Sequence, residues 1–382
     1  MGNKNINVGS DLAVFFAPES SLLTPHIPEA GEAVRALSAT IGRPVNRVFA
    51  RDRRGGRSQY ERVTLRQPVI PWSIDCLMRP SGTAGTAPDD GNLWKHLMGT
   101  ESISTSTSVT YSFLEDPTSL SATIYVGRTH TQEGVWGAIV NKATVTWGEG
   151  LVKVSFAGEG TGYINAGYAL AAGISTSTTR LAVSDGSQFT AYAMIQLGDD
   201  DNSGAGFRVE AVSGDVLTLS VATSVASSSA VKAFLPDPTY TGDPLGDTAG
   251  SLSLDNSATT VAFLPSSIEI TNGVSLLTME ALEADASDVL AAGIRSVMPN
   301  LSFLVTRENN NLVNDMRADT EYDGLITIGG TAGKRFKVDM PKLELDVGDQ
   351  DSPEEGVEKW SATGPALASA SSGGDECTIV FD

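Results

Sequence analysis

Hydrophobic and polar residues alternate with a period of two along most of this chain, a pattern typical of half-buried β-strands. It predicts a strand over 69–78, a hairpin made of 109–114 and 120–126, and another hairpin made of 138–147 and 151–158. Helical spacing is confined to short stretches, so the chain should be mainly β. The predicted helices cover 29–40, 92–98 (closing at Gly99, with Asp89 and Asp90 available as caps) and 279–294.

One nine-residue pattern, G-x-x-K-x-S-x-x-G, occurs at 150–158 and again 206 positions later, at 356–364. Other features recur in the same order: a strand-like run bracketed by Pro and Arg, a short helical segment opening with Asn-Leu, and an alternating strand led by Lys. A period this long indicates two whole domains, divergent copies of one unit, each with its own core. The matched positions are Pro71 with Pro299, Arg79 with Arg307, Asn92 with Asn311, and Lys142 with Lys342.

The pattern changes between the copies. Short strands separated by Ser, Asp and Gly turns indicate a small all-β module there. The predicted division is therefore a first domain at 1–172 with an N-terminal arm and an Arg-rich loop, an inserted module at 173–236, and a second domain at 237–382.

The net charge of −20 opposes nucleic-acid binding, and it is distributed unevenly. Between Arg43 and Arg66 there are eight arginines and two acids, so this window carries +6 and the remainder −26. No apolar run approaches the roughly 18 residues of a membrane span, and no secretory segment is expected after Met1. Cys76 and Cys377 are expected to be small buried hydrophobes, not a disulfide.

Catalytic constellations are missing from the sequence, so we expect no enzyme activity and no cofactor. His26, His96 and His130 lie far apart, and each is expected to be an ordinary surface or loop histidine. There is no G-x-S-x-G or C-x-x-C motif. The Gly-rich stretch 329–334 departs from a phosphate loop and predicts a hairpin turn instead.

One stretch has the spacing of a calcium-binding loop, with Asp199, Asp201, Ser203 and Glu210 as the candidate ligands. Both of its flanks have strand patterns, and an Asp/Asn/Gly turn produces the same residues without a metal. We therefore expect no metal site and keep calcium as the alternative.

The Arg-rich stretch centres on Gly55-Gly56, which predicts a long hairpin or loop between two strands. It could be a solvated surface loop, a nucleic-acid contact, or a surface that docks on an acidic face of an identical neighbour. The −26 on the rest of the chain favours docking, with copies stacked head to tail. The expected contact residues between stacked rings are Arg43, Arg47, Arg51, Arg53, Arg54, Arg57 and Arg62. The expected acidic partner surface consists of Asp346, Asp349, Asp351, Glu354 and Glu355.

The segments 72–99 (WSIDCLMRPSGTAGTAPDDGNLWKHLMG) and 135–160 (VWGAIVNKATVTWGEGLVKVSFAGEG) resemble the tail tube, or major tail, proteins of long, non-contractile-tailed bacteriophages. The resemblance implies two tandem tail-tube-like β-sandwich domains with short flanking helices, plus the small inserted module. In the family six such domains close into a ring, and their inner sheets form one continuous barrel. A duplicated chain would supply two of the six domains, so three chains would make a ring.

The resemblance also implies the partners: the protein itself in rings and tubes, a tape-measure protein, and tail terminator and tail-tip proteins. Genomic DNA would pass through without specific binding, and no membrane insertion is implied. The protein would be assembled in the bacterial host cytoplasm and would reside in the tail of the virion. We further hypothesise that much of the −26 faces the channel and that 173–236 lies outside the tube.

Two other classes of function remain open. The chain could be a β-rich virion decoration or adhesin-like protein that grips a surface glycan through 173–236. It could also be a hydrolase of unrecognised type, although the missing His, Ser and Cys constellations disfavour that hypothesis.

Overall fold

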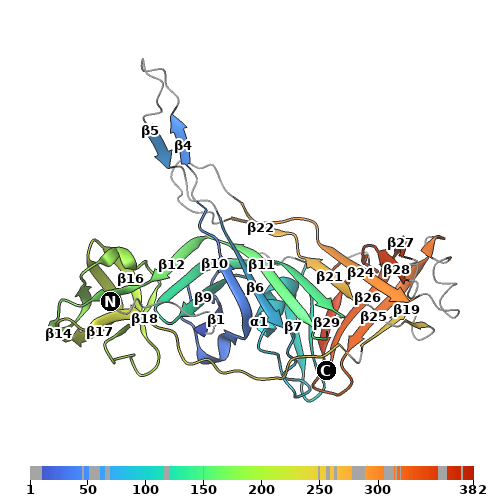
Figure 1. The fold of residues 1–382 in the computed structure, drawn as a ribbon, viewed down its shortest axis with the longest axis horizontal. Helices are drawn as coiled ribbons and strands as arrows, with labels where there is room; N and C mark the ends of the chain where they lie inside the picture. The colour runs from blue at the N-terminus through green and yellow to red at the C-terminus, as the bar shows by residue number, and fades with distance from the viewer. Residues whose placement is uncertain are drawn as a thin grey trace.

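The computed structural model of the chain is mainly β and is built from antiparallel sheets (Figure 1). Helix α1 (Gly91–Met98) ends at Gly99, which has a φ of 98°, as the sequence predicts. In the part of the chain that the structure describes, no helix has the length and apolarity to cross a membrane. The described residues are 11–44, 47–50, 61–64, 69–115, 120–148, 150–247, 250–254, 259–261, 265–277, 289–304, 314, 316–318, 320–351, 359–370 and 373–382.

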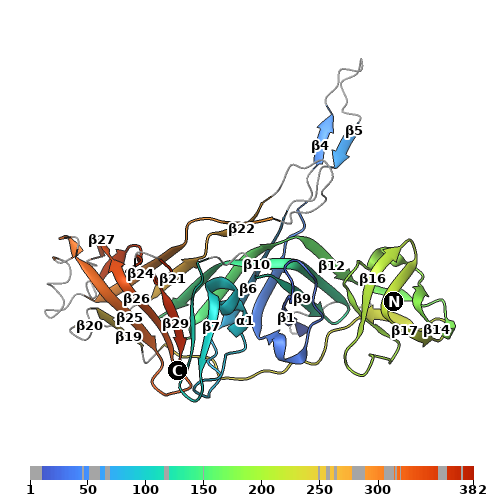
Figure 2. The ribbon, with the colours of Figure 1, turned by 180° about the vertical axis from the view of Figure 1, so that it is seen from behind.

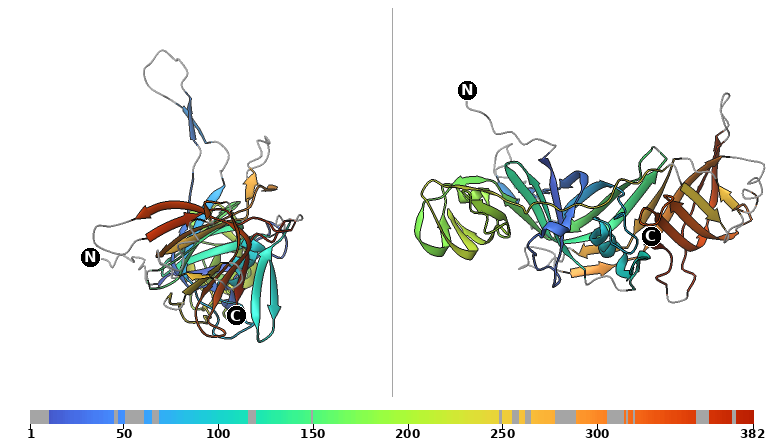
Figure 3. Two further views of the ribbon diagram at one scale, coloured as in Figure 1. Left: turned by 90° about the vertical axis from the view of Figure 1, so that its right-hand side faces the viewer. Right: turned by 90° about the horizontal axis from the view of Figure 1, so that it is seen from below.

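The molecule is elongated, and its parts follow one another along its long axis (Figures 1 and 2). A six-stranded sheet formed by residues 168–233 lies at one end, and strands within residues 296–363 lie at the other. Between them lies the first half of the chain, residues 11–166. The view from below in Figure 3 shows the same succession. We call residues 250–382 the second half.

The strands of the first half form two layers that share the long strand β10. In one layer β1 pairs with β2 and β9, and the first part of β10 lies between β9 and β12. In the other layer the second part of β10 pairs with β11, which pairs with β6, which pairs with β3. The strands are β1 (Ala13–Pro18), β2 (Ala33–Val34), β3 (Ala36–Ile41), β6 (Ile70–Leu77), β9 (Ala122–Arg128), β10 (Thr131–Trp147), β11 (Lys153–Gly160) and β12 (Gly162–Ala166).

The second half pairs its strands in the same order. β19 pairs with β20 and β25, and β26 lies between β25 and β29. β27, which follows β26 directly, pairs with β28, which pairs with β24, which pairs with β21. β26 and β27 together therefore take the place of β10. The strands are β19 (Gly250–Leu254), β20 (Thr259–Val261), β21 (Ser266–Thr271), β24 (Ser296–Leu304), β25 (Glu321–Ile328), β26 (Phe336–Glu344), β27 (Asp346–Asp351), β28 (Lys359–Thr363) and β29 (Thr378–Phe381).

A hairpin is inserted at the same place in both halves, between β3 and β6 and between β21 and β24. In the first half it contains β4 (Arg47–Ala50) and β5 (Glu61–Thr64), which pair with each other and stand away from the sheets (Figure 1). This ladder confirms the hairpin expected around Gly55-Gly56. In the second half it contains β22 (Val274–Leu277) and β23 (Val289–Ala292), and Val274 and Leu276 pack against Ile139 of β10.

The two halves are joined through both layers. β10 pairs with β21, and β8 (Ser108–Phe113), paired with β7 (Gly99–Ser104), adds itself to β29. The rings of Trp94, Phe336 and Phe381 meet across the join, with centroids 5.5 to 6.4 Å apart. Residues of both halves therefore belong to one hydrophobic cluster, and the expectation that each would have its own core is not met.

The repeated nine-residue motif has a local physical cause. Lys153 and Lys359 are exposed, and buried residues alternate with them along β11 and β28. The last glycine of each copy lies against a main-chain carbonyl. A Cβ on Gly158 would lie 1.8 Å from the oxygen of Ile139, and one on Gly364 would lie 1.9 Å from that of Glu344. No side chain fits at that separation, so glycine is required in both copies.

Replacing either of these glycines by alanine should destabilise the fold strongly. Because the new Cβ would meet a backbone atom that cannot rotate away, we expect Gly158→Ala and Gly364→Ala each to lower the free energy of unfolding by about 3 kcal/mol. Gly31→Ala is the control, since no atom lies within 4 Å of its Cβ position. Denaturant unfolding of the monomer measures all three, and equal stabilities would contradict this account of the motif.

The strand pairing corrects the alignment of the two halves. Ile74 lies opposite Phe156, and Leu301 lies opposite Ala362, so β6 and β24 correspond with an offset of 227 and not the 228 of Pro71 with Pro299. Burial agrees, because Pro71 is exposed whereas Pro299 is buried. A slip of one residue moves every side chain to the other face of a sheet.

A second alignment fails in the same way. Lys142 lies opposite Ala157. Thr363 is the counterpart of Ala157, 206 positions later in the repeated motif, and it lies opposite Asp346. Asp346 therefore corresponds to Lys142, and Lys342 does not. The bulge in β10 and the break between β26 and β27 hide this correspondence from the sequence. Asn311, matched with Asn92, lies outside the described residues.

Other predictions had mixed outcomes. The hairpin of 138–147 with 151–158 and the turn at 329–334 are confirmed by the β10–β11 and β25–β26 pairs. Cys76 and Cys377 are buried and free, as expected. The hairpin of 109–114 with 120–126 is wrong, because β8 pairs with β7 and β29, whereas β9 pairs with β1 and β10.

Two predicted helices are also wrong. Residues 29–40 form a 3-10 turn followed by β2 and β3, because pairing with β1 and β6 overrides a weak local propensity. Within 279–294, Val289–Ala292 form strand β23, and 278–288 lie outside the described residues.

The six-stranded sheet begins at Tyr168, five residues before the boundary predicted at 173. It packs on the first half, with Phe15, Tyr125 and Ile164 in its hydrophobic cluster, and buried Gln132 bonds to two of its backbone groups. Its strands are β13 (Tyr168–Leu170), β14 (Ile174–Ala182), β15 (Met194–Leu197), β16 (Phe207–Ser213), β17 (Val216–Val225) and β18 (Ala230–Ala233), in the order β13-β18-β15-β16-β17-β14.

Candidate functional site

The two free ends of one sheet are the first candidate site. Strands β3, β6, β11, β10, β21, β24, β28 and β27 follow one another in that order, and we call them the central sheet. Among the described strands, β3 pairs with β6 alone and β27 pairs with β28 alone. Each therefore presents one unpaired side, and unpaired strand edges invite the addition of another strand.

The unpaired side of β3 presents main-chain hydrogen-bonding groups. The N–H of Gly42 donates to the carbonyl of Pro71 on β6, at 2.7 Å. Because successive residues of a strand point to opposite sides, the N–H groups of Ala39 and Ile41 point away from β6. They are directed towards the place that a neighbouring strand would take.

The pairing of β10 with β21 shows how two such edges can be joined. Six residue pairs connect the two strands, from Lys142 opposite Thr271 to Trp147 opposite Ser266. The Nζ of Lys142 lies 2.7 Å from the carboxylate of Glu269. The strand order of the two halves gives β10 the same place as β27, and β21 the same place as β3. The two strands joined in the middle of the central sheet are therefore the counterparts of the two left free at its ends.

In the other layer, the edges at β12 and β29 are covered, by different segments in the two halves. β29 is covered by β8. β12 is covered by the segment between β14 and β15, where Ala166 bridges Phe189 and the N–H of Asn165 donates to the hydroxyl of Thr190 at 2.7 Å. On its other side this layer ends at β2 and β20, which pair, among the described strands, only with β1 and β19. The central sheet differs in that a joined pair of strands, β10 and β21, is the counterpart of its two free edges.

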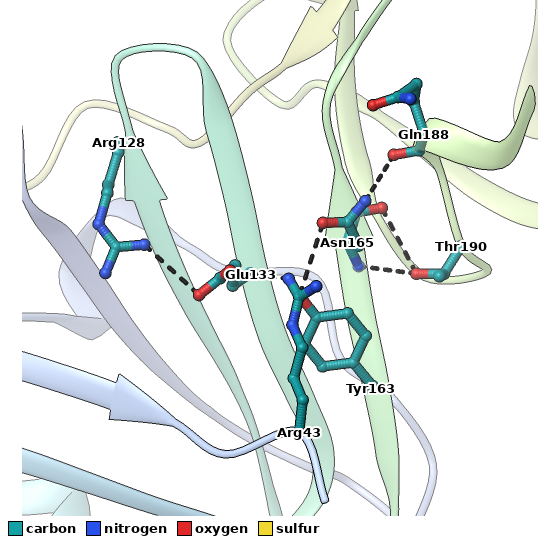
Figure 4. A network of polar contacts seen from close by, with 7 residues as sticks. All are labelled: Arg43, Arg128, Glu133, Tyr163, Asn165, Gln188 and Thr190. Carbon is teal, nitrogen blue, oxygen red and sulfur yellow. Dashed lines mark hydrogen bonds and ion pairs between the residues drawn. The ribbon is translucent and has the colours of Figure 1, made fainter. Parts of the chain in front are cut away.

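Arg43 is the one predicted contact arginine whose side chain the structure describes. Its guanidinium donates to the carboxylate of Glu133 at 2.7 Å and lies 4.2 Å from the centre of the Tyr163 ring (Figure 4). Arg128 donates to the other oxygen of Glu133 at 3.4 Å, and Tyr163 donates to Asn165. This network fixes the chain where it leaves β3 towards the β4–β5 hairpin, so Arg43 has an intramolecular role that the sequence did not indicate.

The other predicted contact residues are only partly within the described chain. Arg47 lies on β4 and Arg62 on β5, so the structure places two of the arginines on the hairpin that stands away from the sheets. Arg51, Arg53, Arg54 and Arg57 lie outside the described residues. On the acidic side, Asp346 is exposed at the start of β27, Asp349 and Asp351 are positions of the same strand, and Glu354 and Glu355 lie outside the described residues.

The described side chains on the solvent face of the central sheet are rich in hydroxyl groups and carry little net charge. Side chains on this face alternate with the buried ones along each strand. Among the side chains that the structure describes on this face, four are acids and three are lysines, and the expectation that much of the negative charge faces a channel stays a prediction. The acids are Asp75, Glu159, Glu269 and Asp346, the lysines are Lys142, Lys153 and Lys359, and the other polar residues include Thr40, Ser73, Thr144, Thr146, Ser155, Ser267, Thr271, Asn300, Ser302, Ser361 and Thr363.

The calcium candidate forms a tight turn with its own hydrogen bonds. The carboxylate of Asp201 accepts from the N–H of Gly204 at 3.0 Å, and Asn202 and Ser203 have positive φ angles. Glu210 is paired with Arg208 at 2.7 Å. In the described part of the chain, no group of three or more His, Cys, Asp or Glu side chains is arranged to hold a metal ion.

His96 differs from the prediction, because it is buried in the core and not on the surface. Its ring nitrogens lie 2.7 Å from the carbonyl of Asn92 and 3.2 Å from that of Ser121, and the Phe16 ring packs edge-on against it at 5.0 Å. Burial lowers the pKa of His96 to about 4. It is therefore an uncharged part of the core at neutral pH.

Asp90 precedes α1, but its carboxylate does not cap the helix backbone as predicted. It accepts a hydrogen bond from the indole N–H of Trp94 at 3.1 Å, whereas Asp89 accepts from the backbone and hydroxyl of Thr241. Burial raises the pKa of Asp90 to about 7, and burial likewise raises the pKa of Glu32 to about 7. Both groups therefore hold protons in the folded chain at pH values where the unfolded chain has released them.

This difference predicts a loss of stability as pH rises. The contribution of the Asp90 proton to the free energy of unfolding is fully present below about pH 4. It is lost as pH rises to about 7, with a slope of about 1.4 kcal/mol per pH unit. Asp90→Asn keeps an acceptor for Trp94 and cannot ionise. Between about pH 4.5 and 6.5, the free energy of unfolding of the variant should therefore decrease less steeply with pH than that of the wild type, by about 1.4 kcal/mol per pH unit. Identical slopes in urea titrations of the two proteins would contradict the assignment.

Sequence reasoning missed the free edges entirely. Residues 36–40 of β3 were predicted to be helical, and 346–351 were noted only for their acidic side chains. The repeated motif could have located β27. In the first copy, the strand that pairs with the motif strand precedes it in the sequence by only a short turn, so a strand was to be expected before the second copy as well. Neither the protein-family models nor the curated proteins compared with this chain gave a match.

Proposed function

We propose that this protein is a structural virion subunit that assembles into stacked rings and so forms the tail tube of a long-tailed phage. One observation carries the proposal: the two halves have the same strand order, they are joined side by side through β10 and β21, and the counterparts of these two strands are free at the ends of the central sheet. In this proposal the halves are two tandem copies of a tube domain, and residues 168–233 form a module beside them.

A contact between β27 of one copy and β3 of the next uses two different surfaces. Contacts of this kind generate a closed ring or an open filament. Closure removes every free edge of the central sheet, and that is a physical reason for obligate assembly. With six repeats per ring, the number in the family that the chain resembles, three chains complete a pseudo-hexameric ring.

The solvent face of the central sheet would then line the channel. Proteins hold nucleic acid chiefly through Lys and Arg contacts to phosphates, and each such contact adds to the affinity. The described side chains of this wall are mainly hydroxyl groups with three lysines and four acids, and they provide no basic track. DNA could therefore pass without being bound, and the extended tape-measure protein could occupy the same space before it.

The arginine-rich hairpin is proposed to connect one ring to the next. Its strands β4 and β5 stand away from the sheets, and its window carries +6 on a chain whose remainder carries −26. The complementary surface on an adjacent ring is proposed to be Asp349 of β27 with Glu354 and Glu355, since Asp346 lies on the face that would line the channel. Opposite charges on two separate surfaces favour stacking in one direction.

Electron microscopy of the purified protein tests the proposed function. We expect rings with a central hole, or tubes made of such rings. Compact particles that never polymerise at any protein concentration would overturn the proposal and favour the decoration or adhesin-like alternative.

A further inference from the structure

We infer that neighbouring chains are joined by β27 of one copy and β3 of the next, in the register that the chain already uses between β10 and β21. In this register Asp351 lies opposite Thr40, and Gln350 lies opposite Ile41. The inference rests on the proposed function, because it specifies the contact by which a ring would close. The partner is a second copy of this chain.

The register follows from the correspondence of the two halves. On one side of the joint, Lys153 and Lys359 occupy the same place in the repeated motif. Thr146 lies opposite Lys153, and Asp351 lies opposite Lys359, so Thr146 corresponds to Asp351.

On the other side of the joint, Ser73 and Asn300 correspond with the offset of 227. Thr40 lies opposite Ser73, and Ser267 lies opposite Asn300, so Thr40 corresponds to Ser267. Within the chain Thr146 lies opposite Ser267. The joint between chains therefore places Asp351 opposite Thr40.

The hydrogen-bonding directions agree with this register. Asn272 donates its N–H to Asn141 of β10, so Ile268, four residues earlier on β21, also points towards β10. Ile41 is the counterpart of Ile268, and its N–H points to the open side of β3. By the same alternation, Thr146 and Ser267 face each other without exchanging main-chain hydrogen bonds. The corresponding pair between chains, Asp351 and Thr40, is then of the same kind, in which facing residues approach most closely.

A chain cannot satisfy its own edges in this way. β3 and β27 are the first and last strands of the central sheet, with six strands between them. The strand that fills either edge must therefore come from another copy. Each copy presents one edge of each kind, so contacts continue head to tail until they close.

The ion pair of the internal joint is not carried over. The counterpart of Lys142 is Asp346, and the counterpart of Glu269 is Gly42, because β21 and β3 correspond with the same offset of 227. The joint between chains therefore depends on main-chain hydrogen bonds and packing. Salt screens ion pairs but has little effect on such contacts, so rings should persist at about 1 M salt.

The test is a disulfide between chains. In T40C/D351C, mild oxidation of assembled protein should link chains into dimers and closed trimers on a non-reducing gel, because facing residues of such a pair lie within disulfide reach. T146C/S267C marks the internal joint and should form a disulfide within single chains. T40C/D346C, which is out of register, should stay unlinked. The native cysteines are buried and are retained in all variants.

A mixture of the single variants T40C and D351C provides an independent measurement, since it should yield dimers only. Rings that assemble normally but link through T40C/D346C, or through neither pair, would overturn the register and leave the proposed function standing. If no rings form under any condition, both the proposed function and this joint are wrong.

Discussion

Ala39→Pro should leave the monomer folded and abolish ring formation. Proline has no N–H, and the N–H of Ala39 points to the open side of β3, so the pairing of β3 with β6 keeps its hydrogen bonds. A donor lost and an acceptor left unpaired cost about 1–3 kcal/mol at each joint, or roughly ten- to a hundredfold in its association constant. Every joint of the ring carries the same defect. Size-exclusion chromatography and circular dichroism measure assembly and folding separately.

The opposite edge offers a second test of the same joint. Gln350→Pro changes β27 at the residue placed opposite Ile41, and it should block assembly as Ala39→Pro does. Ala39→Ser keeps the N–H and nearly the same size, so it should assemble like the wild type. Normal rings from both proline variants would show that these edges do not meet.

Reversing Arg51, Arg53 and Arg54 to Glu should stop tube growth while leaving single rings intact. The change takes the charge of the arginine-rich window from +6 to zero. If this hairpin docks on an acidic face of the next ring, attraction is lost and repulsion replaces it. We expect tube length in electron micrographs to fall at least tenfold, with stacked rings replaced by separate ones, since the loss of even two kcal/mol per interface has this effect.

Arg180→Glu is the control for added negative charge, because Arg180 is exposed on β14, far from the hairpin. It should form tubes of normal length. Wild-type tubes should also separate into rings at about 1 M salt, where the screening length is about 3 Å. Tubes of normal length from the triple variant would remove the stacking role of these arginines.

The sequence predicted the parts of the fold that depend on local chemistry. Gly158 and Gly364 recur because a carbonyl blocks any side chain at both places, so the repeat was visible without a structure. Helix α1 was predictable because Gly99 ends it with a positive φ. The alternation of buried and exposed residues identified β6 and β11 for the same reason, since each strand has one buried face.

The parts that depend on distant pairing were not predictable. β8 and β9 are adjacent in sequence, yet β8 pairs with β29 from the other end of the chain. The short strand β3 has a helix-compatible sequence and becomes a strand because β6 is beside it. Correspondence between the halves was recognised from the motif, but the bulge in β10 and the break between β26 and β27 displaced the matched lysines. The matched prolines are one residue out of register, which only the strand pairing could reveal.

The candidate site, too, was predictable from the sequence only in part. The arginines were apparent from composition, and Arg47 and Arg62 do lie on a hairpin that stands away from the sheets. The network around Arg43 was not apparent, because Glu133 and Tyr163 approach it through the pairing of β10 with β12. The free edges were not apparent either, because a strand is an edge only when no other strand pairs with one of its sides, and this depends on the whole fold.

The mass of a single ring tests the central claim most directly. Rings released from tubes, or formed at high salt, can be weighed intact by native mass spectrometry. If each chain supplies two of six equivalent repeats joined through β27 and β3, the mass will be that of three chains. A ring of six chains, or a monomer at every concentration, would contradict this account of the fold as a doubled unit completed by its neighbours.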